Sequence, residues 1–135
     1  MSRKIARELT FKVIFSFNFQ NENEQIETLI DNLEKETNDI NLEDKEYIKN
    51  IVKGVIETKD NLDETIQKYL KDWTMDRISK TDLAILRVAV YEILYREDIP
   101  YKVSVNEAVE LAKSFSDDSS PSFVNGVLAG IISGL

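Results

Sequence analysis

The stretch SKTDLAILRVAVYEILY, residues 79–95, decides the fold. When it is wound as a helix, apolar side chains cover nearly every side, which is typical of a helix buried in a core. Ser79 is expected to cap its N-terminus, with Asp82 at the third helical position. Arg87 is expected to be a buried structural charge that needs a carboxylate partner. The sequence therefore predicts a central helix around which the others pack.

Helical spacing of apolar residues extends over almost the whole chain, which holds only two Pro and four Gly. We predict an all-α fold of about seven helices in two packed sub-bundles that meet near residues 58–75, with residues 1–135 forming one domain. A break is expected at residues 98–100, and Gly54 suggests close helix packing. The other six helices are expected from about Arg3 to Phe19, around Ile26–Leu33, after a cap at Asn41, over Leu62–Leu70 before Trp73, from a capping box at Ser104–Glu107, and from Ser120 as cap with Pro121 as the first helical residue.

The composition excludes several classes of site. The 135 residues include no Cys and no His, so disulfides, thiolate metal sites and histidine chemistry are excluded. No apolar run approaches the ~18 residues of a membrane span, and the N-terminus has no signal-peptide pattern. The acidic pairs Glu107 with Glu110 and Asp117 with Asp118 have no nucleophile or phosphate-binding loop beside them. We expect a soluble, cytoplasmic protein that is not an enzyme and holds no cofactor or metal.

The charge is distributed unevenly along the chain. The formal net charge is -8, which argues against broad nonspecific binding of nucleic acid. Residues 22–46 hold ten Asp or Glu and two Lys, whereas residues 1–12 hold four basic residues and one Glu. Contact with a polyanion is therefore expected at the N-terminal end.

Basic and aromatic residues share one face of the first expected helix. Arg3, Arg7 and Phe11 lie four residues apart, with Lys4 beside them. Arginine binds phosphate in two-point fashion, and an aromatic ring can receive an unstacked base, so the pattern is typical of RNA binding. The alternative is a group of basic residues that are merely solvated near a helix start.

A short polar loop between two expected helices is the second candidate contact. Small polar residues separate Phe115 from Phe123, and the loop ends at a helix N-terminus, whose backbone N–H groups can bind an anion. Asp117 and Asp118 would repel phosphate, and Lys102 and Lys113 are expected to flank the region and offset them. The alternative is a capped interhelical loop without a ligand.

Six motifs in this order and spacing resemble the NusB family, and the resemblance spans essentially the whole chain. Each motif is weak alone, but the ordered set is specific. They are Trp73, Asp82–Arg87, Tyr91–Glu92, Asp98–Pro100, Val105–Lys113 and Phe123–Leu128, and the start of the chain matches the family at Ala6–Glu8.

The resemblance implies an all-helical bacterial transcription antitermination factor without catalytic activity. Members of this family pair with the small-subunit ribosomal protein that acts as NusE. Together they bind boxA RNA in nascent rRNA transcripts and join the complex that lets RNA polymerase read through terminators.

The resemblance also assigns binding residues. It implies that Arg3, Lys4 and Arg7 contact RNA. This N-terminal segment has fewer basic residues than that of family members with several successive arginines. By position, the loop before the last helix adds Ser119 and Phe123. Phe123 is either an RNA contact or part of the core.

Partner contact is implied at Phe15 on the first helix and at Asp82 on the fifth. A homodimer is a further expectation, because some members of the family self-associate. One alternative is a structural helical module that dimerises through Phe11, Phe15 and Phe19 and has no RNA role. Another is the RNA-binding domain of rRNA cytosine methyltransferases, but no Gly-rich turn of a cofactor-binding domain follows here.

Overall fold

The computed structural model describes residues 3–17, 28, 31–32, 35, 41–71 and 74–135, and these residues contain helices and no strand, as predicted. Most of the expected helix around Ile26–Leu33 lies outside the described residues, although residues 28 and 31–32 are helical, and Trp73 lies outside them as well. None of the described helices combines the length and the apolar content that a membrane crossing requires. The helices are α1 (Arg3–Ser16), α3 (Leu42–Glu57), α4 (Lys59–Lys68), the 3-10 helix η1 (Met75–Arg77), α5 (Lys80–Tyr95), α6 (Tyr101–Phe115) and α7 (Ser120–Ser133).

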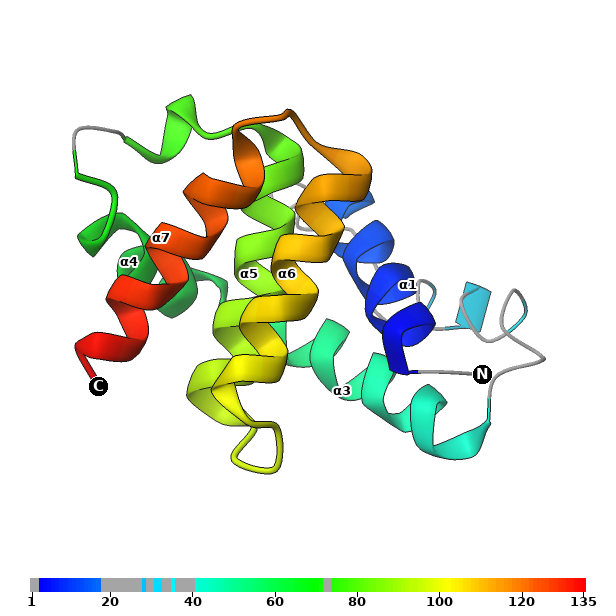
Figure 1. Cartoon of the computed structure of the whole chain (residues 1–135). Helices are drawn as coiled ribbons and strands as arrows, with labels where there is room; N and C mark the ends of the chain where they lie inside the picture. The colour runs from blue at the N-terminus through cyan, green and yellow to red at the C-terminus, as the bar shows by residue number, and fades with distance from the viewer. Residues whose placement is uncertain (1–2, 18–27, 29–30, 33–34, 36–40, 72–73) are drawn as a thin grey trace.

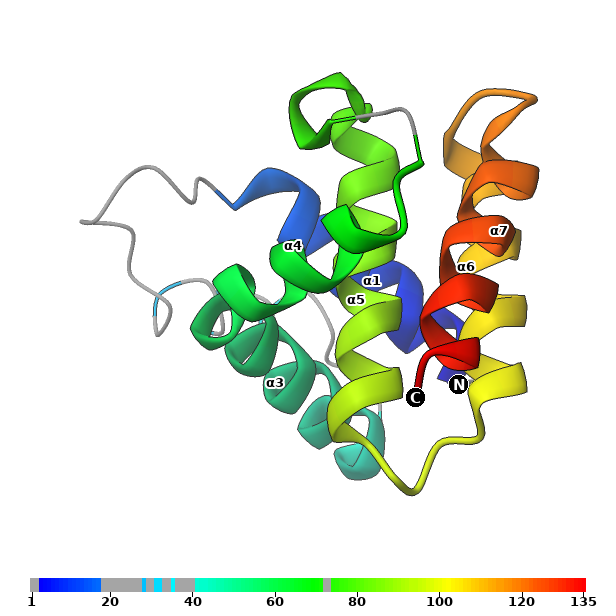
Figure 2. The ribbon, with the colours of Figure 1, turned by 90° about the vertical axis from the view of Figure 1, so that its left-hand side faces the viewer.

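Helix α5 is the centre of the fold, as its apolar sequence predicts. It contacts α1, α3, α4, α6 and α7, and its residues Leu86 and Val90 are fully buried (Figure 1). Helices α3 and α4 lie on one side of α5, and α6 and α7 lie on the other (Figure 2). Helix α1 packs mainly on α3 and α5, while α6 packs mainly on α7 and α5. The two sub-bundles therefore share α5, and α4 contacts both α3 and α7.

The caps predicted for two helices are confirmed. The Asn41 side chain accepts a hydrogen bond from the backbone N–H of Asp44 at 2.8 Å. The Ser79 hydroxyl accepts one from the backbone N–H of Asp82 at 3.0 Å. Each bond satisfies a backbone donor that has no partner inside its own helix.

The predicted start of the sixth helix is wrong by a few residues, and the predicted cap of the last helix is wrong by one. Helix α6 begins at Tyr101 after the cap position Pro100, because the expected break at residues 98–100 ends just there. Ser104 lies inside the helix and its hydroxyl bonds Glu92 rather than a backbone group. Helix α7 is capped at Ser119 without a side-chain hydrogen bond, and Ser120 is its first helical residue.

The carboxylate partner of Arg87 is Asp63 on α4. The guanidinium Nε and Nη2 donate to the two Asp63 oxygens at 2.8 Å each, and Lys59 Nζ lies 3.4 Å from the same carboxylate. A two-point ion pair of this kind fixes both angle and distance. It therefore sets the position of α4 along α5.

Gly54 on α3 is required by close packing, as expected. A Cβ atom at this position would overlap the ring of Tyr91 on α5, and the Tyr91 ring is stacked on Tyr95 with centroids 5.0 Å apart. The absence of a side chain at Gly54 lets the two helix backbones approach each other.

We predict that Gly54→Ala lowers the free energy of unfolding by about 1–3 kcal/mol, because Tyr91 must leave its stack. Gly126→Ala is the matched control, since a Cβ there meets nothing within 4 Å. Alanine's helix propensity should make that control more stable by up to about 1 kcal/mol. Urea denaturation of both variants measures the difference, and equal shifts of the same sign would contradict the packing argument.

Candidate nucleic-acid interface

The start of α1 presents two basic side chains at the surface. Arg3 is half-buried, with its Nε donating to Asp44 Oδ1 at 3.0 Å and its guanidinium carbon 4.4 Å from the ring centre of Tyr47. Its Nη2 lies 3.6 Å from Glu43, which is highly exposed. Lys4 is exposed beside it. The structure therefore places both residues where a phosphate can reach them.

The exposed face predicted for Arg7 and Phe11 is wrong. Only 4% of Arg7 and 3% of Phe11 are exposed, because this side of α1 packs against its neighbouring helices. The Arg7 guanidinium donates through Nε to Glu92 Oε2 at 3.0 Å and through Nη2 to Oε1 at 3.1 Å. Direct RNA contact needs an exposed guanidinium, so we leave Arg7 out of the contact set.

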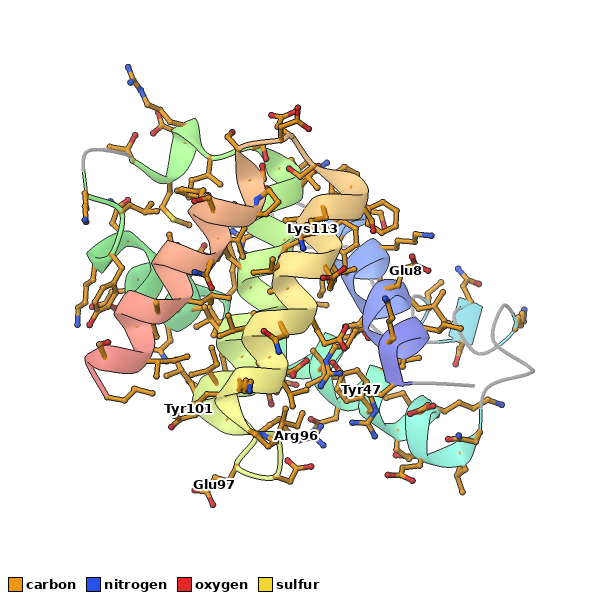
Figure 3. The ribbon with its side chains drawn as sticks, in the orientation of Figure 1. Glu8, Tyr47, Arg96, Glu97, Tyr101 and Lys113 are labelled. Atoms are coloured by element: carbon orange, nitrogen blue, oxygen red, sulfur yellow. The ribbon has the colours of Figure 1, made fainter. Side chains whose placement is uncertain are left out.

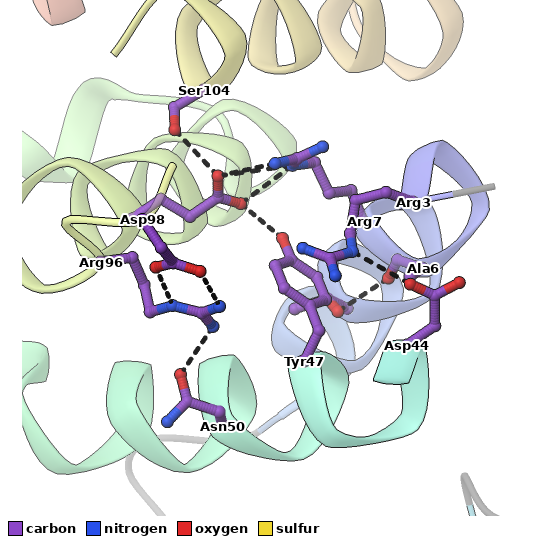
Figure 4. Close-up of polar contacts among 11 residues, drawn as sticks. Arg3, Ala6, Arg7, Asp44, Tyr47, Asn50, Arg96, Asp98 and Ser104 are labelled. Carbon is purple, nitrogen blue, oxygen red and sulfur yellow. Dashed lines mark hydrogen bonds and ion pairs between the residues drawn. The ribbon is translucent and has the colours of Figure 1, made fainter. Parts of the chain in front are cut away.

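Glu92 on α5 joins four helices through one buried carboxylate (Figure 4). It accepts hydrogen bonds from Arg7 of α1, the Tyr47 hydroxyl of α3 and, at 2.8 Å, the Ser104 hydroxyl of α6. Burial, and then the charge of Glu92, raise the pKa of Tyr47 far above its usual value. Burial alone would lower the pKa of Arg7, but the bonds and charge of Glu92 raise it overall, so Arg7 stays charged. Sequence reasoning missed Glu92 and Tyr47, because both lie at core positions of their helices.

The loop before α7 is tied to the start of α5. Asp82 is 7% exposed, and its carboxylate accepts the hydroxyls of Ser116 at 2.7 Å and Ser120 at 2.9 Å. Ser119 is exposed in this loop, and Phe123 is half-buried against the core. Phe123 therefore packs inward and keeps part of its surface accessible.

Lys102 is exposed, but it does not flank that loop as expected. It lies in the first turn of α6, whereas the loop follows the last turn at Phe115. At 1.5 Å per residue the two ends are roughly 20 Å apart. Of the two lysines expected there, only Lys113 lies at the loop end of α6, in its last turn.

Phe15 lies beside the start of α5. It is half-buried, 6.1 Å from the ring centre of Phe11, and Lys80 Nζ lies 5.2 Å from its own ring centre. Lys80 is two residues before Asp82. The structure thus brings together the two segments expected to contact a protein partner, although the Asp82 carboxylate itself is turned inward.

A narrow groove of about 110 Å³ separates α1 from α6, and the sequence did not indicate it. It leads from Lys4 to Phe115, next to the loop that holds Ser119. Phe115 is 38% exposed and packs on Phe11 with ring centres 5.4 Å apart. Figure 3 labels Glu8 and Lys113, which lie on the same side of the molecule. The remaining lining residues are Ile5, Glu8, Glu107, Glu110, Leu111 and Ser114.

Within the described ranges, no three acidic side chains gather in a way that could hold a metal ion, and no buried side-chain polar atom lacks a hydrogen-bond partner. The described surface therefore offers charge and aromatic contact, and the buried polar groups are engaged within the fold.

Comparison with known proteins identifies close relatives. Residues 4–133 match the model of the NusB family. The transcription antitermination protein NusB of Acetivibrio thermocellus is 45% identical over 134 residues, which cover 98% of this chain and 89% of that protein. The structure of T. maritima NusB superposes with a TM-score of 0.86 at 32% identity, covering 98% of this chain and 92% of that one. A structure of antitermination factors NusB and NusE in complex with dsRNA matches with a TM-score of 0.85 at 27% identity, covering 98% and 97%.

We predict that Arg7→Met lowers the free energy of unfolding by about 3–5 kcal/mol, because it leaves the buried Glu92 carboxylate without its counter-charge. The matched control is Arg77→Met in η1, where the side chain is exposed and the effect should stay within about 0.5 kcal/mol. Urea denaturation with circular dichroism measures both. An Arg7→Met protein as stable as the control would show that Glu92 does not depend on this ion pair.

Proposed function

The chain belongs to the NusB family, and from that premise we propose that it is a bacterial transcription antitermination factor. It binds boxA RNA of nascent rRNA transcripts together with the small-subunit ribosomal protein that acts as NusE. The resulting complex helps RNA polymerase to read through terminators. The protein acts in the cytoplasm by binding, without catalysis or a cofactor. Residues 1–135 form one domain, which is supported by a single core cluster that extends from Ala6 to Ile131.

The observation that carries this proposal is the basic edge at the start of α1. The chain has a net charge of -8, which repels RNA. RNA binding therefore requires a surface on which positive charge is locally concentrated. Arg3 and Lys4 provide it, and Arg3 is already held in place by Asp44 and Tyr47. A guanidinium that is fixed before binding loses less conformational freedom when it meets a phosphate.

The loop before α7 supplies a second set of RNA contacts in this proposal. Ser119 is exposed, and the accessible part of Phe123 can contact a base. Lys4 lies at one end of the groove between α1 and α6 and this loop lies next to the other, and the lining between them includes Glu8, Glu107 and Glu110. Lys102, at the far end of α6, would contact the backbone of a longer strand.

NusE contact is proposed at Phe15 and the neighbouring start of α5. Phe15 supplies apolar surface, and Asp82 holds the adjoining loop by accepting the hydroxyls of Ser116 and Ser120. The acidic surface elsewhere suits a basic ribosomal protein, because opposite potentials speed encounter. The competing proposal is a homodimer through an apolar face of α1. Of the residues expected on that face, Phe11 is buried, Phe15 is half-buried and Phe19 lies outside the described residues.

We predict that the double variant Arg3→Ala, Lys4→Ala weakens boxA RNA binding about tenfold or more, with and without NusE. The slope of log affinity against log salt should fall by about 1.4, because each phosphate contact to a single strand contributes about 0.7. Fluorescence anisotropy at two salt concentrations measures both quantities.

The matched control for that experiment is Lys68→Ala, Lys71→Ala, which removes the same charge from two exposed positions, the last residue of α4 and a residue just after it. Its affinity should stay within about twofold of the native chain. Equal losses for both double variants would show that binding follows net charge only. An absence of RNA binding in every condition would favour the helical interaction module or dimer instead.

We predict that Phe123→Leu keeps the fold, with a loss of less than about 1.5 kcal/mol in unfolding free energy, because the core contact survives in a side chain of similar volume. RNA affinity should fall about fivefold or more, since stacking on an aromatic ring is lost. Thermal melting and anisotropy on the same samples separate the two effects. Lower stability with native RNA affinity would assign Phe123 to the core alone.

A further inference from the structure

The buried ring of Tyr47 holds Arg3, and we propose that Tyr47 is a positioning residue for RNA binding at the start of α1. The proposal rests on the RNA-binding function proposed above. Tyr47 is 2% exposed, so it cannot touch RNA itself. Any effect of Tyr47 on RNA must therefore pass through a neighbouring side chain.

Arg3 is held from two directions by one helix. Its guanidinium carbon lies 4.4 Å from the centre of the Tyr47 ring, and its Nε donates to Asp44 Oδ1 at 3.0 Å. Asp44 and Tyr47 are three residues apart on α3, so they lie on the same face. The ring fixes the plane of the guanidinium, and the carboxylate fixes its rotation within that plane.

The Tyr47 ring is itself fixed by the buried carboxylate of Glu92. Its hydroxyl donates to Glu92, which is also bound by Arg7 at 3.0 and 3.1 Å and by Ser104 at 2.8 Å. The ring cannot tilt away from Arg3 without breaking a buried hydrogen bond. The orientation of the Arg3 guanidinium thus depends on contacts from four helices, α1, α3, α5 and α6 (Figure 4).

The held guanidinium borders an open groove of about 640 Å³. Arg96 also lines this groove, with its guanidinium carbon 5.7 Å from the same ring centre and its side chain bonded to Asn50 and Asp98 (Figure 4). Arg3 therefore has the Tyr47 ring and the Asp44 carboxylate on its inner side, and its outer side borders the groove. Its Nη2 lies 3.6 Å from the exposed Glu43 carboxylate, which a phosphate would have to replace, and Glu46 and Asp98 also line the groove.

The test compares three changes in boxA RNA affinity. Tyr47→Leu should weaken binding about three- to fivefold, because the aromatic face under Arg3 is lost. Tyr47→Phe keeps the ring, so its affinity should remain within about twofold of native while its thermal midpoint falls. The combination Tyr47→Leu, Arg3→Ala should bind no more weakly than Arg3→Ala alone, because both changes remove one interaction.

Two results would overturn the proposal. One is a folded Tyr47→Leu protein that binds RNA like the native chain. The other is a double variant whose loss equals the sum of the two single losses, since Tyr47 would then act independently of Arg3. If Tyr47→Leu fails to fold, Tyr47→Met, which is unbranched and adapts to irregular gaps, takes its place.

An NMR measurement tests, without RNA, whether the Tyr47 ring holds the Arg3 side chain in place. In the native chain, the side-chain protons of Arg3 should be shifted upfield by the Tyr47 ring, and Tyr47→Phe should keep that shift. An unshifted Arg3 in the native chain would reject the positioning role regardless of any variant. If Arg3 is shifted but the native chain binds no boxA RNA, the proposed function fails while the placement of Arg3 by Tyr47 stands.

Discussion

The carboxylate of Glu92 is only 1% exposed, so it requires a counter-charge and hydrogen-bond donors. The four helices around Glu92 supply both. Arg7 supplies the counter-charge, and Tyr47 and Ser104 supply further hydrogen bonds. Each donor comes from a different helix, so the position of α1, α3 and α6 relative to α5 is fixed by direction as well as by apolar contact. An apolar residue in place of Glu92 would pack, but it would not specify these angles.

The same contact explains why the outer surface of α1 can carry a defined cation. The ion pair with Glu92 holds the Arg7 face of α1 against the core, and the first turn of α1 lies at the edge of the molecule. At this edge, Arg3 donates a hydrogen bond to Asp44 and lies over the ring of Tyr47, both on α3. The proposed RNA edge is therefore joined to the core through Tyr47 and its hydrogen bond to Glu92.

Local patterns in the sequence predicted most of the fold. The features that the sequence did not predict depend on contacts between residues that are distant in the chain. The central helix, the caps at Asn41 and Ser79 and the break at residues 98–100 depend on near neighbours or on composition, and Gly54 indicated close packing without indicating its partner Tyr91. The inward turn of Arg7 could not be predicted, because its partner lies 85 residues away. Arg3 and Lys4 were found at the surface as expected, whereas Tyr47 has the spacing of an ordinary core residue and carries no sign of its contact with Arg3.

The separation of 85 residues between Arg7 and Glu92 also has a consequence during synthesis. At about 5–20 residues per second, Glu92 is added roughly 4 to 17 seconds after Arg7. Until then α1 has no counter-charge to dock against, and Tyr47 has no acceptor for its hydroxyl. The N-terminal basic residues are therefore made well before the carboxylate that anchors their helix, and the full set of contacts around them forms only after α5 has been added.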